Sequence, residues 1–172
     1  RVSRFLIADL AGHGENVARN ARHLRMLMRK YINRPDQAEF VRHLNQEFEE
    51  ASGPREFATA LVGTYVAETD ELTICSAGHP LPVWRGANSG GWQVLAPEVS
   101  ECYAVYCDLP LGIAHPTGYR QFAVSLKKGD VILLYTDGLL EAKSPTGELF
   151  DTAGVLETLA GVDPGRPDTI IA

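Results

Sequence analysis

The order of the predicted secondary-structure elements constrains this fold more than any other feature. An apolar strand over residues 2–8 is followed by two amphipathic helices, residues 15–32 and 37–51, and then by a series of short strands. Consecutive strands joined by short turns pair as antiparallel hairpins, and helices inserted among them cover a face of the sheets. The order therefore predicts an α+β fold, an antiparallel β-sandwich flanked by α-helices.

Turn residues and helix caps set the boundaries of these elements. Residues 33–36 (NRPD) break the first helix, and Asp36 is placed to cap the second. Residues 78–84 should be extended, because each proline pushes the residue before it toward the β region. The other expected strands are residues 57–66, 72–77, 92–95, 119–126 and 131–135. A helix is expected over residues 149–160, and Asp168 should cap one more.

The first predicted helix has one apolar face and one basic face. The apolar arc consists of Val17, Asn20, Ala21, Leu24, Leu27, Met28, Tyr31 and Ile32. The basic arc consists of Arg19, Arg22, Arg25, Arg29 and Lys30. The basic arc is either a docking surface for an acidic partner or a solvated surface paired with acids of the second helix. Those acids are Glu39, Glu47 and Glu50.

Composition excludes several classes of protein. The 172 residues are 45% hydrophobic and 22% charged, which is typical of a single domain that buries a core. No apolar run approaches the ~20 residues of a membrane span. A formal net charge of −6 disfavours nucleic acid as a partner. The three cysteines, Cys75, Cys102 and Cys107, are too few and odd in number for a disulfide framework, which favours reduced thiols and a cytoplasmic location.

Two aspartates stand at the ends of apolar strands, directly before turns that contain glycine. Asp9 lies in FLIADLAGHG and Asp137 lies in VILLYTDGLLEA. A carboxylate at a strand end has a fixed backbone, and oxygen-only ligands suit Mg²⁺ or Mn²⁺ rather than Zn²⁺. Taken alone, each aspartate is explained more simply without a metal, Asp9 as a helix cap or turn residue and Asp137 as part of an Asp-Gly turn, so the residues themselves leave a metal site open.

Six segments taken together resemble a known family. They are DLAGHG at 9–14, FATA at 57–60, SAGHP at 76–80, LPLGI at 109–113, GD at 129–130 with LYTDGLLEA at 134–142, and GELF at 147–150. Their order and spacing resemble the PPM-type metal-dependent serine/threonine protein phosphatases of the SpoIIE and RsbU type. The resemblance implies a β-sandwich flanked by helices, two Mn²⁺ or Mg²⁺ ions, and hydrolysis of phosphoserine or phosphothreonine on a partner protein by a metal-bound water.

The resemblance also implies roles for individual residues. Asp9 corresponds to the aspartate that bridges the two ions, Leu10 supplies a main-chain carbonyl, and Asp137 is a terminal ligand of one ion. His13 is a candidate general acid, because an imidazole with an ordinary pKa of about 6.5 can protonate a leaving serine oxygen. The resemblance assigns His79 to a structural turn, and no spacing near Cys75 supplies the further ligands of a zinc site.

The resemblance predicts missing parts as well. In the family, the first metal aspartate comes from a Gly-Gly-Asp strand upstream of residues 8–14, and the last comes from a strand beyond Ala172. We therefore expect residues 1–172 to form one phosphatase domain that is incomplete at both termini and binds Mn²⁺ weakly. The alternative is a non-catalytic pseudophosphatase that serves as a regulatory protein-binding domain.

The expected partners follow from the same resemblance. They are a phosphorylated protein substrate, for example an anti-sigma-factor antagonist in bacterial signalling, and an upstream sensor or regulatory domain. Helices like residues 15–32 convey control in the family, so a third interpretation is that this helix repositions Asp9 on a signal. Dimerisation is a further expectation, including association through strands exposed at the ends of the chain.

Overall fold

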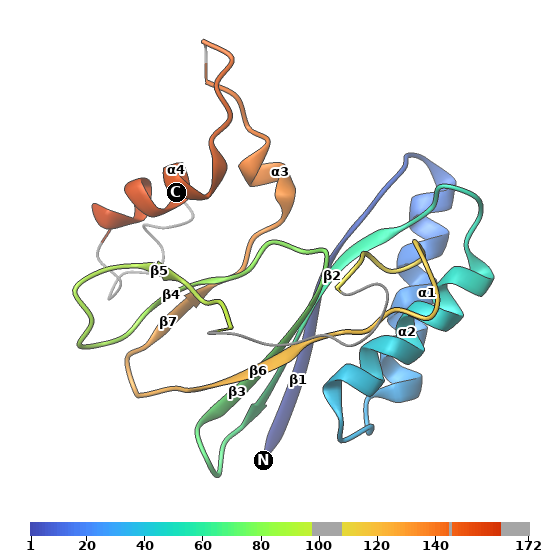
Figure 1. The fold of residues 1–172 in the computed structure, drawn as a ribbon, viewed down its shortest axis with the longest axis horizontal. Coiled ribbons are helices and arrows are strands. Elements are labelled where there is room, and N and C mark those ends of the chain that lie inside the picture. Colours follow the sequence, from blue (N-terminus) through green and yellow to red (C-terminus); the bar gives the residue numbers. More distant parts are fainter. Residues whose placement is uncertain (98–107, 145, 163–172) are drawn as a thin grey trace. The chain divides into compact units, whose positions relative to one another are not determined.

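The computed structural model describes residues 1–97, 108–144 and 146–162. Contacts within the chain divide it into two units (Figure 1). Unit 1 comprises Arg1–His79 and Pro97–Ser125, and unit 2 comprises Pro80–Ala96 and Leu126–Ala172. Each unit contains an antiparallel sheet and helices of its own, which confirms the predicted α+β class with two antiparallel sheets and flanking helices.

The sheet of unit 1 has four strands in the order β1-β2-β3-β6. The strands are β1 (Val2–Leu10), β2 (Ala58–Val66), β3 (Glu71–Ala77) and β6 (Gln121–Ser125). Each pair is antiparallel, and β2 and β3 form the predicted hairpin. The segment with the lowest exposure is β2, because it has a strand on both sides and helices over one face.

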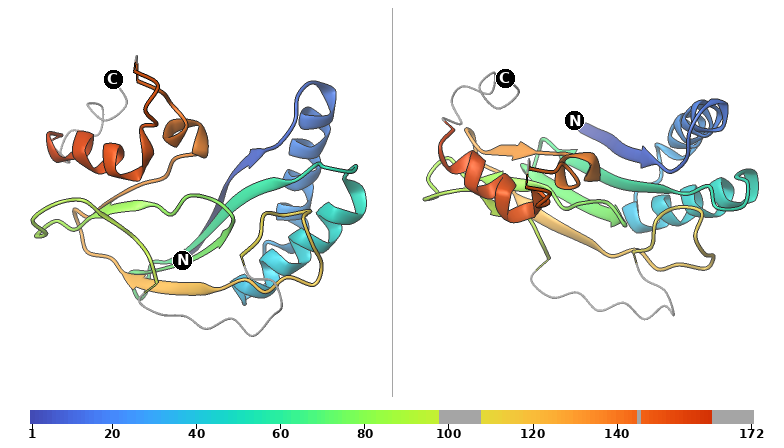
Figure 2. Two further views of the ribbon diagram at one scale, coloured as in Figure 1. Left: turned by 45° about the horizontal axis from the view of Figure 1, so that its top comes forward. Right: turned by 90° about the horizontal axis from the view of Figure 1, so that it is seen from above.

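Helices α1 (Glu15–Tyr31) and α2 (Gln37–Ala51) lie side by side on the same face of this sheet (Figure 2). Their boundaries match the prediction within one residue, and the Asp36 carboxylate caps α2 by accepting from the Glu39 N–H at 2.6 Å. The core between helices and sheet includes Leu24, Leu27, Phe40, Val41, Leu44, Phe48, Ala58, Ala60 and Val62.

Part of the predicted apolar arc of α1 is wrong. Leu24, Leu27 and Asn20 are buried, but Ala21 and Ile32 are exposed. Ile32 follows the last residue of α1 and is 37% exposed. The basic arc points to solvent as expected.

The first strand also differs from its prediction. β1 extends to Leu10, two residues beyond the predicted strand over residues 2–8, so Asp9 and Leu10 both belong to the strand. The strand is exposed at its start and half-buried along the rest, although its apolar sequence favours burial. The physical reason is its position at the end of the sheet, where only one neighbouring strand covers it within the described part of the chain.

Unit 2 is built from shorter elements. Its sheet has the order β5-β4-β7, and α3 (Asp137–Leu140) and α4 (Asp151–Ala160) follow it. The strands are β4 (Val83–Arg85), β5 (Gln93–Val94) and β7 (Val131–Leu133). Val83, Tyr135, Val155 and Leu159 form the buried cluster of this unit.

Unit 2 differs from the prediction at three places. β7 ends at Leu133 and not at residue 135, and Asp137 begins a short helix, α3, that was not predicted. α4 begins at Asp151 and not at residue 149, because Leu149 pairs with Lys143 across a hairpin. In the part of the chain that the structure describes, no helix is both long and apolar enough to cross a bilayer.

Candidate metal site

Asp9 lies near the end of β1, directly opposite Thr59 of β2. Its neighbours in the strand, Ala8 and Leu10, pack against the core that α1 and α2 cover. Because successive side chains of a strand alternate between the two faces of a sheet, Asp9 is directed to the face away from those helices. Nine consecutive residues of β1 pair with β2 in one register, so the backbone at Asp9 is held firmly.

The main-chain carbonyl of Leu10 points away from β2. Leu10 pairs with Ala58, yet the N–H and C=O of Ala58 bond to Leu111 on the other side of β2, at 3.0 and 2.8 Å. Directly opposed residues in an antiparallel pair either exchange both hydrogen bonds or neither. Leu10 therefore also turns its polar main-chain groups outward, at the edge of the described sheet. A carbonyl in this position can accept a cation.

A buried hydrogen bond lies beside Asp9. The Thr59 hydroxyl is 2.9 Å from Nδ1 of His79, and both residues are buried. The SAGHP turn is closed by Ser76, whose hydroxyl donates to the His79 carbonyl at 2.8 Å and accepts from the His79 N–H at 3.1 Å. This confirms the structural turn predicted for His79. Sequence reasoning missed that this turn meets FATA next to Asp9, although both segments stood in the motif set.

The LPLGI segment joins the same region from the other side of β2. Leu111 exchanges two main-chain hydrogen bonds with Ala58, and the buried Asn45 of α2 accepts from the Gly112 N–H at 2.9 Å. Asn45 also donates to the Ala114 carbonyl at 2.8 Å. Gly112 has φ +85°, and a Cβ there would lie 3.0 Å from the Glu56 carbonyl, so both conformation and space require glycine. Four of the six motif segments thus meet in unit 1.

The loop after β1 carries His13 between two glycines. Gly12 has φ +120° and Gly14 has φ +74°, values that favour glycine and allow the chain to turn from β1 into α1. His13 is exposed in this loop. Its predicted role as a general acid stays a prediction.

Asp137 belongs to unit 2 and begins α3, where it is half-buried. Thr136 precedes it with extended backbone, so the strand-like segment turns into the helix at this point. The two motif segments of unit 2 lie together: the Phe150 N–H donates to the Ala142 carbonyl at 2.8 Å, and residues 143 and 149 pair. The GELF segment therefore forms one hairpin with the segment that carries Asp137.

The predicted ligands carry atoms that suit a hard divalent cation. Asp9, Leu10 and Asp137 offer carboxylate and carbonyl oxygens, which suit Mg²⁺ or Mn²⁺. Within residues 1–97, 108–144 and 146–162, no three His, Cys, Asp or Glu side chains come together as a group that could hold a metal ion. The chain as described thus contributes these oxygen donors without a closed cluster of side-chain ligands.

Cys75 is poorly suited to bind a metal. It is 1% exposed in the core, and burial raises the pKa of its thiol to about 12, which disfavours the thiolate that a metal would bind. Cys102, Cys107 and Asp168 lie outside the described residues.

Comparison with known proteins identifies the family. The family model described as Stage II sporulation protein E (SpoIIE) matches residues 2–172. The chain belongs to the SpoIIE family of PP2C-type phosphatase domains. It is 28% identical over 149 residues to the phosphoserine phosphatase RsbU of Bacillus subtilis, and this match covers 83% of the chain and 40% of that protein. The chain therefore spans well under half of this curated relative.

Solved structures of the SpoIIE type have the same fold. The RsbU and RsbW domains of Rv1364c from Mycobacterium tuberculosis match with a TM-score of 0.78 and 27% identity, covering 98% of this chain and 45% of that one. The SiaA-PP2C domain of Pseudomonas aeruginosa matches with a TM-score of 0.74 and 18% identity, covering 98% and 66%. The second likeness shows the fold alone. It agrees with the two antiparallel sheets and flanking helices seen here.

Proposed function

We propose that this SpoIIE domain is the catalytic part of a Mn²⁺- or Mg²⁺-dependent protein phosphatase that acts on phosphoserine or phosphothreonine. The observation that carries the proposal is the end of β1, where Asp9 stands within a fixed strand and the next carbonyl, that of Leu10, is directed away from β2. The family match over residues 2–172 supports the same function.

Asp9, the Leu10 carbonyl and Asp137 are the residues we propose to hold two divalent ions. Such ions, when bound, supply positive charge against the phosphoryl oxygens and acidify water for an in-line attack on phosphorus. The chain contributes stiffness at Asp9, through the register with β2 and the buried Thr59–His79 pair. RsbX, a similar structure with a TM-score of 0.63, has been solved in complex with magnesium.

His13 is proposed to donate a proton to the leaving serine or threonine oxygen. It is exposed on the loop that follows Asp9, where a substrate can reach it. Replacing it with asparagine keeps a polar residue between Gly12 and Gly14 but removes the titratable ring. If His13 is the acid, His13→Asn lowers kcat for a phosphoserine peptide more than for an aryl phosphate, whose leaving group needs less protonation.

The proposed substrate is a phosphorylated protein of a bacterial signalling system that controls a sigma factor, such as an anti-sigma-factor antagonist. RsbU is named a phosphoserine phosphatase, and the Mycobacterium tuberculosis structure joins an RsbU domain to an RsbW domain. A sensor or regulatory domain in the same protein, acting in the cytoplasm, would fit this role. We also propose that α1 transmits the signal, since it follows directly from the β1 strand that carries Asp9.

The test is Mn²⁺-dependent hydrolysis of a phosphoserine peptide by the full-length protein and by Asp137→Asn. We expect the variant to lose activity by about 100-fold or more, because it loses a charged metal ligand. Glu157→Gln is the matched control, since it removes one carboxylate charge from an exposed position of α4 in the same unit. Equal activity in Asp137→Asn and the wild type would exclude the proposed role of Asp137.

The alternative is a pseudophosphatase that binds a regulatory partner. This alternative predicts that neither the wild type nor Asp137→Asn hydrolyses the peptide or binds Mn²⁺. It also predicts that the protein binds a partner without changing the phosphate content of that partner.

The proposed signal through α1 has a separate test. Leu24 and Leu27 anchor α1 on the core and are each 3% exposed. Leu24→Ala should change the Mn²⁺ concentration needed for half-maximal activity in protein that is still folded by circular dichroism. Unchanged metal dependence and activity would show that α1 does not influence Asp9.

A further inference from the structure

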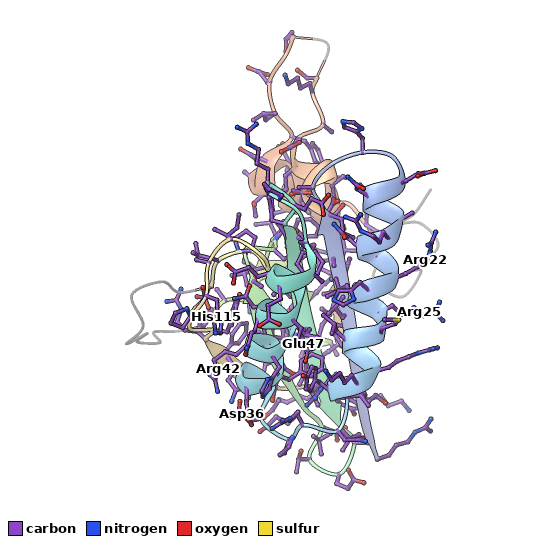
Figure 3. The ribbon with its side chains drawn as sticks, turned by 90° about the vertical axis from the view of Figure 1, so that its right-hand side faces the viewer. Arg22, Arg25, Asp36, Arg42, Glu47 and His115 are labelled. Carbon is purple, nitrogen blue, oxygen red and sulfur yellow. The ribbon has the colours of Figure 1, made fainter. Side chains whose placement is uncertain are left out.

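The basic face of α1 contains two kinds of cation: those that form ion pairs with other segments and those that do not. Arg19 pairs with Glu56 at 3.0 Å and Lys30 pairs with Glu47 at 2.6 Å, so two cations hold α1 to neighbouring segments of unit 1. Arg22, Arg25 and Arg29 are exposed, and none of them has an ion pair within the described part of the chain. In Figure 3, Arg22 and Arg25 extend from α1 on the side away from α2 and Glu47. We call these three residues the arginine stripe.

The arginine stripe is regular. At about 100° per residue its three members fall within roughly 60° on the helical wheel, and it runs for about 10 Å along the helix axis. Met26 lies beside it and is 61% exposed, although methionine is usually buried. Arginine and methionine are both enriched in protein interfaces, where an apolar contact is surrounded by charged groups.

We infer that the arginine stripe and Met26 form a docking surface for an acidic helix of a protein partner. Acidic residues at positions i, i+3 and i+7 of a facing helix have the same spacing as Arg22, Arg25 and Arg29, so three ion pairs can form at once. An apolar residue between them would cover Met26. The inference goes beyond the proposed function, because it concerns a surface of α1 and does not need turnover.

Charge patterning on the chain selects an acidic protein over other polyanions. Residues 1–34 hold eight of the sixteen basic residues but only two of the twenty-two acidic ones. The rest of the chain is therefore strongly acidic and repels an extended phosphate backbone or an anionic bilayer that reaches past α1. A single helix contacts only the stripe and avoids that repulsion. The one large exposed apolar residue of the helix, Met26, is also too little for insertion into a bilayer.

Three unpaired arginines on one helix face also repel one another. Like charges at i,i+4 spacing destabilise a helix, and Arg25 and Arg29 have this spacing. A partner that supplies carboxylates removes this repulsion and forms guanidinium–carboxylate pairs in the same step. The binding free energy of an acidic helix therefore includes relief of strain that α1 carries when it is free.

The probe for the test is a fluorescent peptide of about 18 residues, long enough for a stable helix. It carries glutamate at i, i+3 and i+7 around one leucine, and a second peptide has the same composition with the glutamates spread around the helix. Binding to the full-length protein with Asp137→Asn is measured by fluorescence anisotropy. The Asp137→Asn protein is expected to lack phosphatase activity, and the assay measures only binding. A failure of the peptide to dock is therefore distinct from a failure of the phosphatase proposal.

The stripe variant is Arg22→Gln/Arg25→Gln/Arg29→Gln. Its matched control, Arg42→Gln/Lys128→Gln/Lys143→Gln, removes three exposed cations elsewhere and changes net charge by the same amount. Both leave Arg19 and Lys30 in place, and circular dichroism checks that α1 is retained. We expect the patterned peptide to bind roughly tenfold more weakly to the stripe variant and unchanged to the control, with a marked salt dependence.

Three results would overturn the inference. The first is that the patterned peptide binds the stripe variant and the control variant with equal affinity. The second is that the patterned peptide and the peptide with spread glutamates bind the protein with equal affinity. The third is that heparin or phosphatidylserine vesicles bind through the arginine stripe more tightly than the patterned peptide does.

Discussion

The two units hold their candidate ligands in different ways. In unit 1, Asp9 is the eighth residue of a strand that pairs with β2 along nine residues. In unit 2, Asp137 opens a helix of four residues after a strand of three. A long register fixes a backbone position against many neighbours, whereas a single helical turn depends on its own few hydrogen bonds. The comparison teaches that the backbone at Asp9 is held more stiffly than the backbone at Asp137.

The hydrophobic core of unit 1 is also larger than the core of unit 2. Unit 1 buries Phe40, Leu44 and Phe48 completely between two long helices and the sheet. Unit 2 buries a smaller group around Val83 and Val155. Both tryptophans, Trp84 and Trp92, fall in unit 2, while the long helices fall in unit 1. Tryptophan fluorescence therefore reports mainly on unit 2, and far-ultraviolet circular dichroism mainly on unit 1.

The largest effect on stability is expected from Leu44→Ala. Leu44 is 0% exposed in the core of unit 1, and removing a fully buried leucine side chain costs about 2–5 kcal/mol of unfolding free energy. Urea unfolding should show the circular dichroism midpoint falling more than the tryptophan midpoint. Equal shifts in both signals would mean that the two units unfold as one.

A matched pair of valines sharpens this prediction. Val41 in unit 1 is 1% exposed and Val155 in unit 2 is 2% exposed, so Val→Ala removes the same atoms from each core. Val41→Ala should mainly lower the circular dichroism midpoint, and Val155→Ala should mainly lower the tryptophan midpoint. The reverse assignment would contradict the division into two units.

The next largest effect is expected from Thr59→Val, which keeps the shape of the side chain but removes the hydroxyl beside Asp9. In the variant, Nδ1 of His79 loses its hydrogen bond to the buried Thr59 hydroxyl, which is 2.9 Å away in the wild type. This loss should lower the free energy of unfolding by about 1–3 kcal/mol. Thr73→Val in β3 is the control, because the Thr73 hydroxyl makes no hydrogen bond within the described part of the chain. If the Thr59–His79 pair also positions Asp9, Thr59→Val raises the Mn²⁺ concentration needed for half-maximal activity. The control should leave it unchanged.

The sequence predicted those parts of the fold that depend on local patterns. The helix boundaries at residues 15 and 51 follow from apolar spacing, the Asp36 cap and the Gly-Pro that ends α2, all of which are short-range. The predicted end of β1 was wrong because the length of a strand depends on the strand with which it pairs. Ala58 and Thr59, about fifty residues away, continue the pairing through Asp9 and Leu10.

The surroundings of Asp9 depend on still longer connections. The meeting of Thr59 with His79, and of Ala58 with Leu111, joins segments that no local pattern relates. The order of the motifs indicated that these segments belong to one site, but not which atoms touch. Likewise, the amphipathic pattern gave the basic face of α1, while only the structure separates Arg19 and Lys30, which are paired, from the arginine stripe.

A smaller effect is expected from Asp36→Ala, which removes the cap of α2. The carboxylate accepts from the Glu39 N–H at 2.6 Å, and loss of such a cap costs about 1 kcal/mol. The circular dichroism midpoint should fall while the tryptophan midpoint hardly changes, because the cap belongs to unit 1. Asp36→Asn, whose side-chain oxygen can still accept this hydrogen bond, should recover most of the loss.

The smallest effect is expected from Glu56→Gln and should appear only in the pH dependence of stability. The hydrogen bond from Asn20 at 2.8 Å, together with the Gly53 N–H at 2.9 Å and the nearby Arg19, holds the pKa of Glu56 below its usual value. A carboxyl group with a lowered pKa in the folded state stabilises the protein above its unfolded pKa, and this contribution is lost as the pH falls through the folded pKa. The wild type should therefore exceed Glu56→Gln in stability at pH 7, and the difference should shrink below about pH 4, the ordinary range of a glutamate.

Glu71→Gln, at an exposed position of β3, is the control and should show a smaller change between the two pH values. Because Glu56 ties α1 to the turn that leads into β2, the change should be visible in circular dichroism and weak in tryptophan fluorescence. A difference between wild type and Glu56→Gln that is constant across pH would mean that the charge of Glu56 does not contribute to holding α1 in place.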